Sequence, residues 1–267
     1  MFKENAYTVF CGTEKTREVG TAMLTLENLS FEVNDDKGEK GIIKDISLTV
    51  GDGKFVVITG PNGGGKSTMA KLIMGIEHPN SGRIYFDGQD ITDMSITDRA
   101  NLGISFAFQQ PVRFKGVQVI DLLRLAAKKR LTVAEACQYL SEVGLCAKDY
   151  IDREVNGSLS GGELKRIEIA TVLARASKLS VFDEPEAGID LWSFQNLIQV
   201  FERMRQKTKG SILIISHQER ILSIADEIVV IADGRVVKQG TRDAILPEIL
   251  GTASAVDACN GIQQIEQ

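Results

Sequence analysis

The sequence of 267 residues has few aromatic side chains and no long apolar run. Aromatic residues make up 6% of the chain and Trp192 is the only tryptophan, so the core must be mainly aliphatic, as in a parallel sheet covered by helices. No stretch of about 18 apolar residues occurs, which excludes a membrane-spanning helix. The first 21 residues carry charges throughout and lack the apolar segment of a signal peptide. We therefore expect a cytoplasmic protein without direct membrane insertion.

Cysteine and basic charge are also scarce. The four cysteines form no CxxC pair, which excludes a disulfide framework and a zinc site of the usual spacing, and ordinary packed or surface thiols are expected at Cys11, Cys137, Cys146 and Cys259. The net charge is -5, with 31 Lys and Arg against 36 Asp and Glu. Because nucleic-acid-binding proteins normally have a basic surplus, no nucleic acid partner is expected.

Short apolar runs alternate with helical patterns along most of the chain. The alternating stretch 24–29, the charged turn 35–41 and the strand expected at 43–50 predict an antiparallel start. Further strands are expected at 55–59, 83–86, 104–108, 179–182, 212–215 and 228–231, and helices at 162–177 and 191–207. Strands that alternate with helices predict an α/β fold with a mostly parallel sheet.

Strand signals disappear between residues 111 and 156, where 119–129 and 132–143 have helical periodicity. We interpret this region as a small helical subdomain inserted into the α/β core. The expected divisions are an N-terminal extension (1–22), a core with an antiparallel β subdomain (23–108 and 159–246), the helical subdomain (109–158) and a C-terminal tail (247–267). The sequence leaves open whether the extension and the tail are ordered.

A glycine-rich loop follows the strand expected at 55–59 and precedes a helical stretch. It fits the GxxxxGK[ST] pattern of a phosphate-binding loop and consists of Gly60, Pro61, Asn62, Gly63, Gly64, Gly65, Lys66, Ser67 and Thr68. Glycines permit backbone conformations in which successive N–H groups point at phosphate oxygens, and the following helix adds its positive end. We expect Lys66 to neutralise the β- and γ-phosphates and the Ser67 hydroxyl to bind Mg²⁺.

Two acidic residues end the apolar strand expected at 179–182. Alone, such a pair is usually a solvated turn, but a phosphate site also needs positions for a metal ion and for water. Asp183 is expected to hold Mg²⁺, directly or through water. Glu184 is expected to polarise the water that attacks the γ-phosphate.

A second anion-binding helix start is expected at 159–163. Ser160 is a good N-cap, and Gly161 and Gly162 leave the backbone amides uncovered. The plain alternative is a capped helix with nothing bound. Because the loop 60–68 is already expected to bind the phosphates of one nucleotide, a second anion-binding site at 159–163 is explained best if it contacts a nucleotide held by another copy of the chain.

Together these motifs resemble those of the ATP-binding-cassette (ABC) ATPases, over about residues 23–246. The loop 60–68 looks like their Walker A motif, 159–163 like the signature motif and 179–184 like Walker B with its catalytic glutamate; 187–190 sits where the D-loop belongs. The resemblance implies a P-loop NTPase core, ATP and Mg²⁺ as ligands, and ATP hydrolysis. It also implies a head-to-tail dimer in which ATP lies between Walker A of one copy and the signature motif of the other.

Two further site residues come from the same resemblance. His217, after the strand expected at 212–215, looks like the switch histidine that hydrogen-bonds the γ-phosphate. Gln109 looks like the Q-loop glutamine that joins the core to the helical subdomain and contacts the metal ion, with its neighbour Gln110 as the alternative. The catalytic set implied by the resemblance is Glu184, His217, Lys66 and Gln109, and the metal set is Ser67, Gln109 and Asp183.

The adenine-binding position departs from the family pattern. Most cassettes have a tyrosine or similar ring after the first strand, whereas this chain has Phe31-Glu32-Val33 there, with Val33 at the stacking position. Phe31 is an alternative unless it points into the core. The preference for ATP over GTP is therefore implied by the family alone.

Local detail resembles the SufC family, the ATPases of the SUF system for iron–sulfur cluster assembly. The stretch 107–112, with the Gly-Val at 116–117, is similar to their Q-loop region, and 216–222 is similar to the stretch that begins with their switch histidine. The resemblance implies a soluble SufB/SufD-like scaffold as partner. Segment 183–190 and the short helical subdomain depart from it. The alternative is an ATP-binding subunit that energises a membrane permease.

Overall fold

The structure is a computed structural model that describes residues 22–35, 38–207 and 210–251. Most of the expected N-terminal extension and C-terminal tail, with Cys11 and Cys259, lies outside the described residues. Cys137 is partly buried and Cys146 is exposed, and both are free thiols. Within the three described ranges, no helix is both long enough and apolar enough to cross a membrane.

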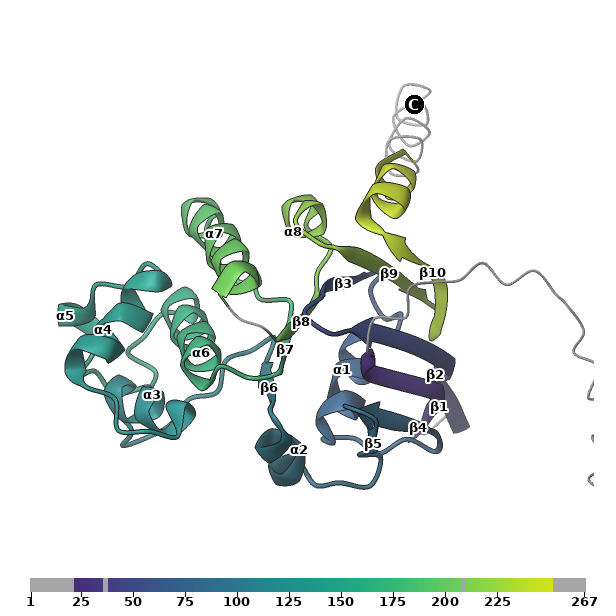
Figure 1. The fold of residues 1–267 in the computed structure, drawn as a ribbon, viewed down its shortest axis with the longest axis horizontal. Coiled ribbons are helices and arrows are strands. Elements are labelled where there is room, and N and C mark those ends of the chain that lie inside the picture. Colours follow the sequence, from purple (N-terminus) through teal and green to yellow (C-terminus); the bar gives the residue numbers. More distant parts are fainter. Residues whose placement is uncertain (1–21, 36–37, 208–209, 252–267) are drawn as a thin grey trace, which may run out of the picture.

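A four-stranded antiparallel sheet forms the N-terminal part of the fold (Figure 1). Its order is β2-β1-β4-β5, with bounds β1 (Ala22–Asp35), β2 (Gly38–Gly51), β4 (Ser81–Phe86) and β5 (Gln89–Asp90). The β1–β2 hairpin confirms the predicted antiparallel start. Both strands extend further than predicted, into the charged segment 35–41, because the pairing continues to Asp35 and Gly38.

A six-stranded sheet of order β10-β9-β3-β8-β7-β6 lies beside the first. Its strands are β3 (Phe55–Thr59), β6 (Ile104–Ala107), β7 (Leu179–Asp183), β8 (Ser211–Ile215), β9 (Glu227–Ala232) and β10 (Arg235–Thr241). All neighbouring pairs are parallel except β9–β10. The predicted mostly parallel sheet is confirmed, and β10 is an addition that the sequence pattern did not indicate.

Helices flank this sheet and extend from it into a separate lobe. The helices at the sheet are α1 (Lys66–Met74), α2 (Ile96–Leu102), α6 (Gly161–Arg175), α7 (Leu191–Lys207) and α8 (Glu219–Ser223); those of the lobe are α3 (Val119–Ala127), α4 (Val133–Glu142) and α5 (Ala147–Tyr150). Figure 1 shows the lobe at the far end of the molecule from the four-stranded sheet, with α6 and α7 between them.

The six-stranded sheet separates two aliphatic cores. All five residues of β3 are buried, and because side chains alternate along a strand, Phe55 and Val57 pack into one core and Val56 and Ile58 into the other. The first core contains α6, α7 and the lobe helices, and the second contains α1 and the four-stranded sheet. Burial on both faces explains why these strands are continuous apolar runs.

A fully buried arginine closes the carboxyl end of α1. Arg99 of α2 donates through Nη1 to the carbonyls of Leu72 and Ile73, at 2.6 and 2.9 Å. It also donates to the carbonyls of Thr92 at 2.7 Å and Met94 at 3.1 Å. The last carbonyls of a helix have no partner within the helix, so this guanidinium satisfies the end of the helix that begins at the phosphate loop.

We predict that Arg99→Met destabilises the protein by about 3 kcal/mol, because it removes four hydrogen bonds of a charged donor, two of them buried. The measurement is the free energy of unfolding from urea denaturation. Arg83→Met is the matched control, since Arg83 forms an exposed ion pair with Asp90 and its removal should shift the midpoint little. Equal midpoints for the two variants would contradict a structural role for Arg99.

Candidate functional site

Apart from the signature residues, the predicted site residues follow the carboxyl ends of four neighbouring parallel strands. The sheet order β3-β8-β7-β6 places side by side the loops that begin at Gly60, Ser216, Glu184 and Phe108. The strands end close to one level, since Ile215 is the register partner of both Ile58 and Asp183. In parallel α/β sheets this edge is where ligands bind.

The phosphate loop depends on glycine at two tight positions. Gly60 has φ 133°, and a Cβ there would lie 2.0 Å from the carbonyl oxygen of Ile231. Gly65 has φ 99°, and its Cβ would lie 2.8 Å from the carbonyl oxygen of Ile42. Gly65 is also the N-cap of α1 and provides no side-chain cap, so the first amides of the helix stay available to an anion.

Lys66 lies inside the loop rather than in solvent. Its side chain is nearly buried, and Nζ donates to the carbonyl oxygens of Gly60 at 2.8 Å and Pro61 at 2.9 Å. Burial lowers the pKa of Lys66, and the nearby carboxylates of Glu184 and Asp183 oppose that shift. The ammonium therefore lies within the predicted phosphate loop and lines the pocket beside it.

The two side chains predicted as principal metal ligands are in contact. The Ser67 hydroxyl donates to Oδ1 of Asp183 at 3.0 Å, and burial raises the pKa of the Asp183 carboxyl while this hydrogen bond opposes the rise. Hydroxyl and carboxylate oxygens suit Mg²⁺, which usually binds a few protein ligands and takes the rest from phosphates and water. No cluster of three or more His, Cys, Asp or Glu that could hold a metal ion occurs in the described part of the chain.

Gln109 and Glu184 are also brought together. Nε2 of Gln109 donates to Oε2 of Glu184 at 2.5 Å. Glu184 has φ 43°, a left-handed conformation that costs a residue with a side chain of order 1 kcal/mol and is concentrated at functional sites. Its N–H is fixed by the carbonyl oxygen of Ile215 at 2.9 Å.

His217 is exposed at the end of β8, and its Nε2 lies 3.5 Å from Nε2 of Gln218. The neighbouring Ser216 is fully buried and donates to Oε1 of Glu186 at 2.5 Å. The other carboxylate oxygen of Glu186 is buried without a hydrogen-bond partner, and burial raises the pKa of this group. Sequence reasoning did not single out Glu186, which ties the loop after β7 to the loop after β8.

None of the signature residues lines the pocket that adjoins the phosphate loop of the same chain. Ser160 caps α6, its Oγ accepting from the Glu163 N–H at 3.3 Å while Oε2 of Glu163 accepts from the Ser160 N–H at 2.7 Å. Ser160 and Gly161 are exposed, and a Cβ on Gly162 would lie 3.6 Å from the carbonyl oxygen of Gly188. This helix start is therefore open to a second molecule.

A pocket of about 310 Å³ adjoins the phosphate loop. It is lined by Lys40, Ile42, Asn62, Gly63, Gly65, Lys66, Ser67, Thr68 and Glu184. Phe31 is buried in the core, and Val33, which is 39% exposed, pairs across the hairpin with Lys40. Lys40 and Ile42 of β2 thus join the site without having been predicted, since nothing in their local sequence marks them.

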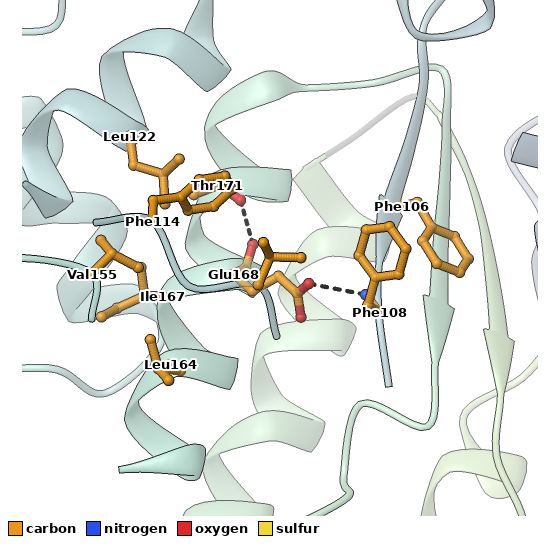
Figure 2. Close-up of a pocket in the computed structure, with 10 residues that line it drawn as sticks. Phe106, Phe108, Phe114, Leu122, Val155, Leu164, Ile167, Glu168 and Thr171 are labelled. Atoms are coloured by element: carbon orange, nitrogen blue, oxygen red, sulfur yellow. Dashed lines mark hydrogen bonds between the residues drawn. The ribbon is translucent and has the colours of Figure 1, made fainter. Parts of the chain in front are cut away.

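An apolar pocket of about 150 Å³ lies between the end of β6 and the helical lobe (Figure 2). We call it the groove; it is lined by Phe106, Phe108, Val112, Phe114, Leu122, Val155, Leu164, Ile167, Glu168 and Thr171. Phe108, Val112 and Phe114 are 36%, 45% and 40% exposed. The wall of the groove therefore includes the chain next to Gln109.

Comparison with known proteins gives close relatives over most of the chain. The ABC transporter family matches residues 43–187. An uncharacterized ABC transporter ATP-binding protein of Methanocaldococcus jannaschii is 42% identical over 213 residues, covering 76% of this chain and 84% of the relative. A probable ATP-dependent transporter, ycf16, of Pyropia yezoensis is 36% identical, covering 76% and 87%. The chloroplastic ABC transporter I family member 6 of Arabidopsis thaliana is 32% identical, covering 82% and 68%.

Solved structures agree with the fold. An ATP-binding cassette of an ABC transporter in its ADP conformation has a TM-score of 0.73 at 26% identity, covering 90% of this chain and 99% of that one. A dimeric cassette bound to ADP and phosphate has a TM-score of 0.74 at 22% identity, covering 82% and 99%. The predicted P-loop NTPase fold of the ABC ATPases is confirmed. The chain belongs to the ABC transporter family and is an ATP-binding-cassette ATPase that binds ATP with Mg²⁺ and hydrolyses it.

Proposed function

We propose that the chain hydrolyses ATP in a head-to-tail dimer and thereby moves a partner protein seated in the groove. The observation that carries this proposal is the 2.5 Å hydrogen bond from Gln109 to Glu184. Gln109 follows Phe108, which lines the groove, and Glu184 lines the pocket at the phosphate loop. A displacement of Phe108 in the groove would therefore be transmitted to the carboxylate of Glu184 through Gln109.

Each site residue has a role in this proposal. Lys66 would exchange its two carbonyl partners for β- and γ-phosphate oxygens. Ser67 and Asp183, together with Gln109, would hold Mg²⁺, which would neutralise charge on the phosphates. Glu184 accepts a proton from the attacking water. His217 donates a hydrogen bond to the γ-phosphate.

Support for the dimer comes from the two predicted anion-binding helix starts, which do not line one common pocket. The loop 60–68 and the exposed residues Ser160 and Gly161 belong to one chain, but the pocket at the phosphate loop has no lining residue from the signature segment. ABC ATPases work as ATP-dependent dimers. Rotating a second copy head-to-tail would complete each site with the partner's signature helix.

We propose a soluble SufB/SufD-like scaffold for iron–sulfur cluster assembly as the partner, in the cytoplasm. The support is the similarity of the stretch 107–117 to the Q-loop region of SufC proteins, because this stretch provides the exposed groove residues Phe108, Val112 and Phe114. The scaffold would hold the nascent cluster, which agrees with the dispersed cysteines of this chain.

A membrane permease is the second candidate partner. The compared relatives from Methanocaldococcus jannaschii and Pyropia yezoensis are named as transporter proteins, which favours an ATP-binding subunit of a transporter. In that case the groove would receive a segment of the permease. The two candidates share the ATPase mechanism and differ in the protein that is moved.

Lys66→Ala is predicted to weaken Mg-ATP binding by roughly tenfold to a hundredfold, because charge-assisted hydrogen bonds to the phosphates are lost. The measurement is the Kd from calorimetry. Lys178→Ala is the control, since Lys178 is an exposed lysine paired with Asp87. An unchanged Kd of the Lys66 variant for Mg-ATP would contradict the assignment of the phosphate site to this loop.

Glu184→Gln is predicted to lower kcat by roughly a hundredfold or more while ATP binding persists, because the general base is lost. The dimer should then accumulate, and size-exclusion chromatography with Mg-ATP measures it. Glu202→Gln, at an exposed position of α7, should behave as the unmodified chain. Wild-type turnover in Glu184→Gln, or a monomer at saturating Mg-ATP, would contradict the proposed site or dimer.

Phe114→Asp is predicted to prevent capture of the partner from a native extract, because it places a charge in the apolar groove. Leu125→Asp is the matched control: Leu125 is 70% exposed and lies outside the groove. We expect the unmodified chain and the control to retain a soluble scaffold protein. Recovery of an integral membrane permease instead would favour the transporter function.

A further inference from the structure

Helix α6 carries two buried charged side chains beneath the Q-loop, Lys165 and Glu168. The Lys165 side chain is 0% exposed and that of Glu168 is 12% exposed, and the two form an ion pair at 3.4 Å. Charged groups are rarely buried this deeply unless they bind something specific. Neither residue belongs to a motif that assigned it a role.

Both side chains bind the main chain of the Q-loop. Oε1 of Glu168 accepts a hydrogen bond from the Phe108 N–H at 2.9 Å, drawn as a dashed line in Figure 2. Nζ of Lys165 donates to the carbonyl oxygen of Phe108 and, at 3.3 Å, to that of Gln109. Three consecutive peptide groups at the end of β6 are thus held by one ion pair on α6.

This arrangement is poorly explained by stability alone. Burial lowers the pKa of Lys165 and raises that of Glu168, and the mutual attraction of the two groups opposes both shifts. Replacing a buried ion pair by apolar side chains is often neutral or stabilising. The pair is better explained by what it holds in place.

The segment that the pair holds leads directly to the hydrolytic site. The Gln109 side chain extends from this main chain to Glu184, and its Nε2 donates to Oε2 of Glu184 at 2.5 Å. On the other side, the Phe108 ring lines the groove and is 36% exposed. A shift of the Phe108 and Gln109 main chain would therefore move the amide away from Glu184.

We propose that Lys165 and Glu168 are positioning residues for ATP hydrolysis, which fix the Q-loop main chain so that Gln109 orients Glu184. The proposal rests on the proposed roles of Gln109 and Glu184. It assigns the ion pair a catalytic consequence without contact to the nucleotide. Substitution of either residue should accordingly lower turnover, and this effect should depend on the presence of Gln109.

The test is a double-mutant cycle on steady-state ATPase kinetics of the full chain. Lys165→Met is expected to lower kcat roughly tenfold with little change in KM for Mg-ATP, because misplacing a catalytic group affects turnover rather than binding. In a Gln109→Ala background the same substitution is expected to have almost no further effect. Ile169→Val, a buried change on the same helix without altered charge, controls for loosened packing.

Variants of Glu168 provide an independent arm in case Lys165→Met does not fold. Glu168→Gln keeps an oxygen that can accept from the Phe108 N–H and should retain most of the turnover. Glu168→Leu removes the acceptor and should therefore lower turnover. As for Lys165→Met, this loss is expected only when Gln109 is present. A merely structural role would lower thermal stability in both backgrounds and leave no dependence on Gln109.

The outcomes separate this proposal from the proposed function. Suppose that Glu184→Gln abolishes turnover, but that the fold-loss in kcat from the Lys165 or Glu168 substitutions multiplies with the fold-loss from Gln109→Ala. The positioning role is then wrong, and the hydrolytic site stands. Unchanged kcat in Lys165→Met and Glu168→Leu has the same meaning. If Glu184→Gln hydrolyses ATP normally, the proposed site itself fails.

Discussion

The site depends on the parallel pairing of β3, β8, β7 and β6. Each strand is short and almost wholly buried, and the pairing lets four loops start at one edge of the sheet. A slip of one residue in β7 would turn Asp183 to the opposite face and separate it from Ser67. The aliphatic cores on both sides of the sheet oppose such a slip, so packing far from the nucleotide determines the geometry at the phosphates.

Helix α6 connects three parts of the molecule that the chain keeps far apart in sequence. Its first turn holds the capped signature segment, its middle binds the Q-loop through Lys165 and Glu168, and its apolar side packs on α3 and α4 of the lobe. Because a helix moves as a rigid element, a rotation of the lobe would carry the signature and the Q-loop together. One element thus couples the surface offered to a second copy with the surface offered to a partner.

The sequence predicted the features that local chemistry specifies. The strand at 55–59 matches the structure because it is a short continuous apolar run, and the helix at 191–207 matches because its apolar residues recur with helical periodicity. The phosphate loop follows from its glycines. Strand β10 was missed because it is mostly polar and exposed, and α2 because its pattern is only seven residues long. The hydrogen bond from the Phe108 N–H to Glu168 could not be predicted, because it joins residues 60 positions apart that come into contact only in the folded chain.

The hydrogen bonds of Lys66 to the carbonyls of Gly60 and Pro61 bear on which anions the loop favours. An anion that takes these two donors from the carbonyls replaces two existing hydrogen bonds, so its net gain from them is the excess over those bonds. A triphosphate presents more charged oxygens to these donors than a small anion does, so we expect it to gain more from the exchange. The same two bonds hold the loop in one conformation before the ligand arrives, so little entropy is lost when it binds.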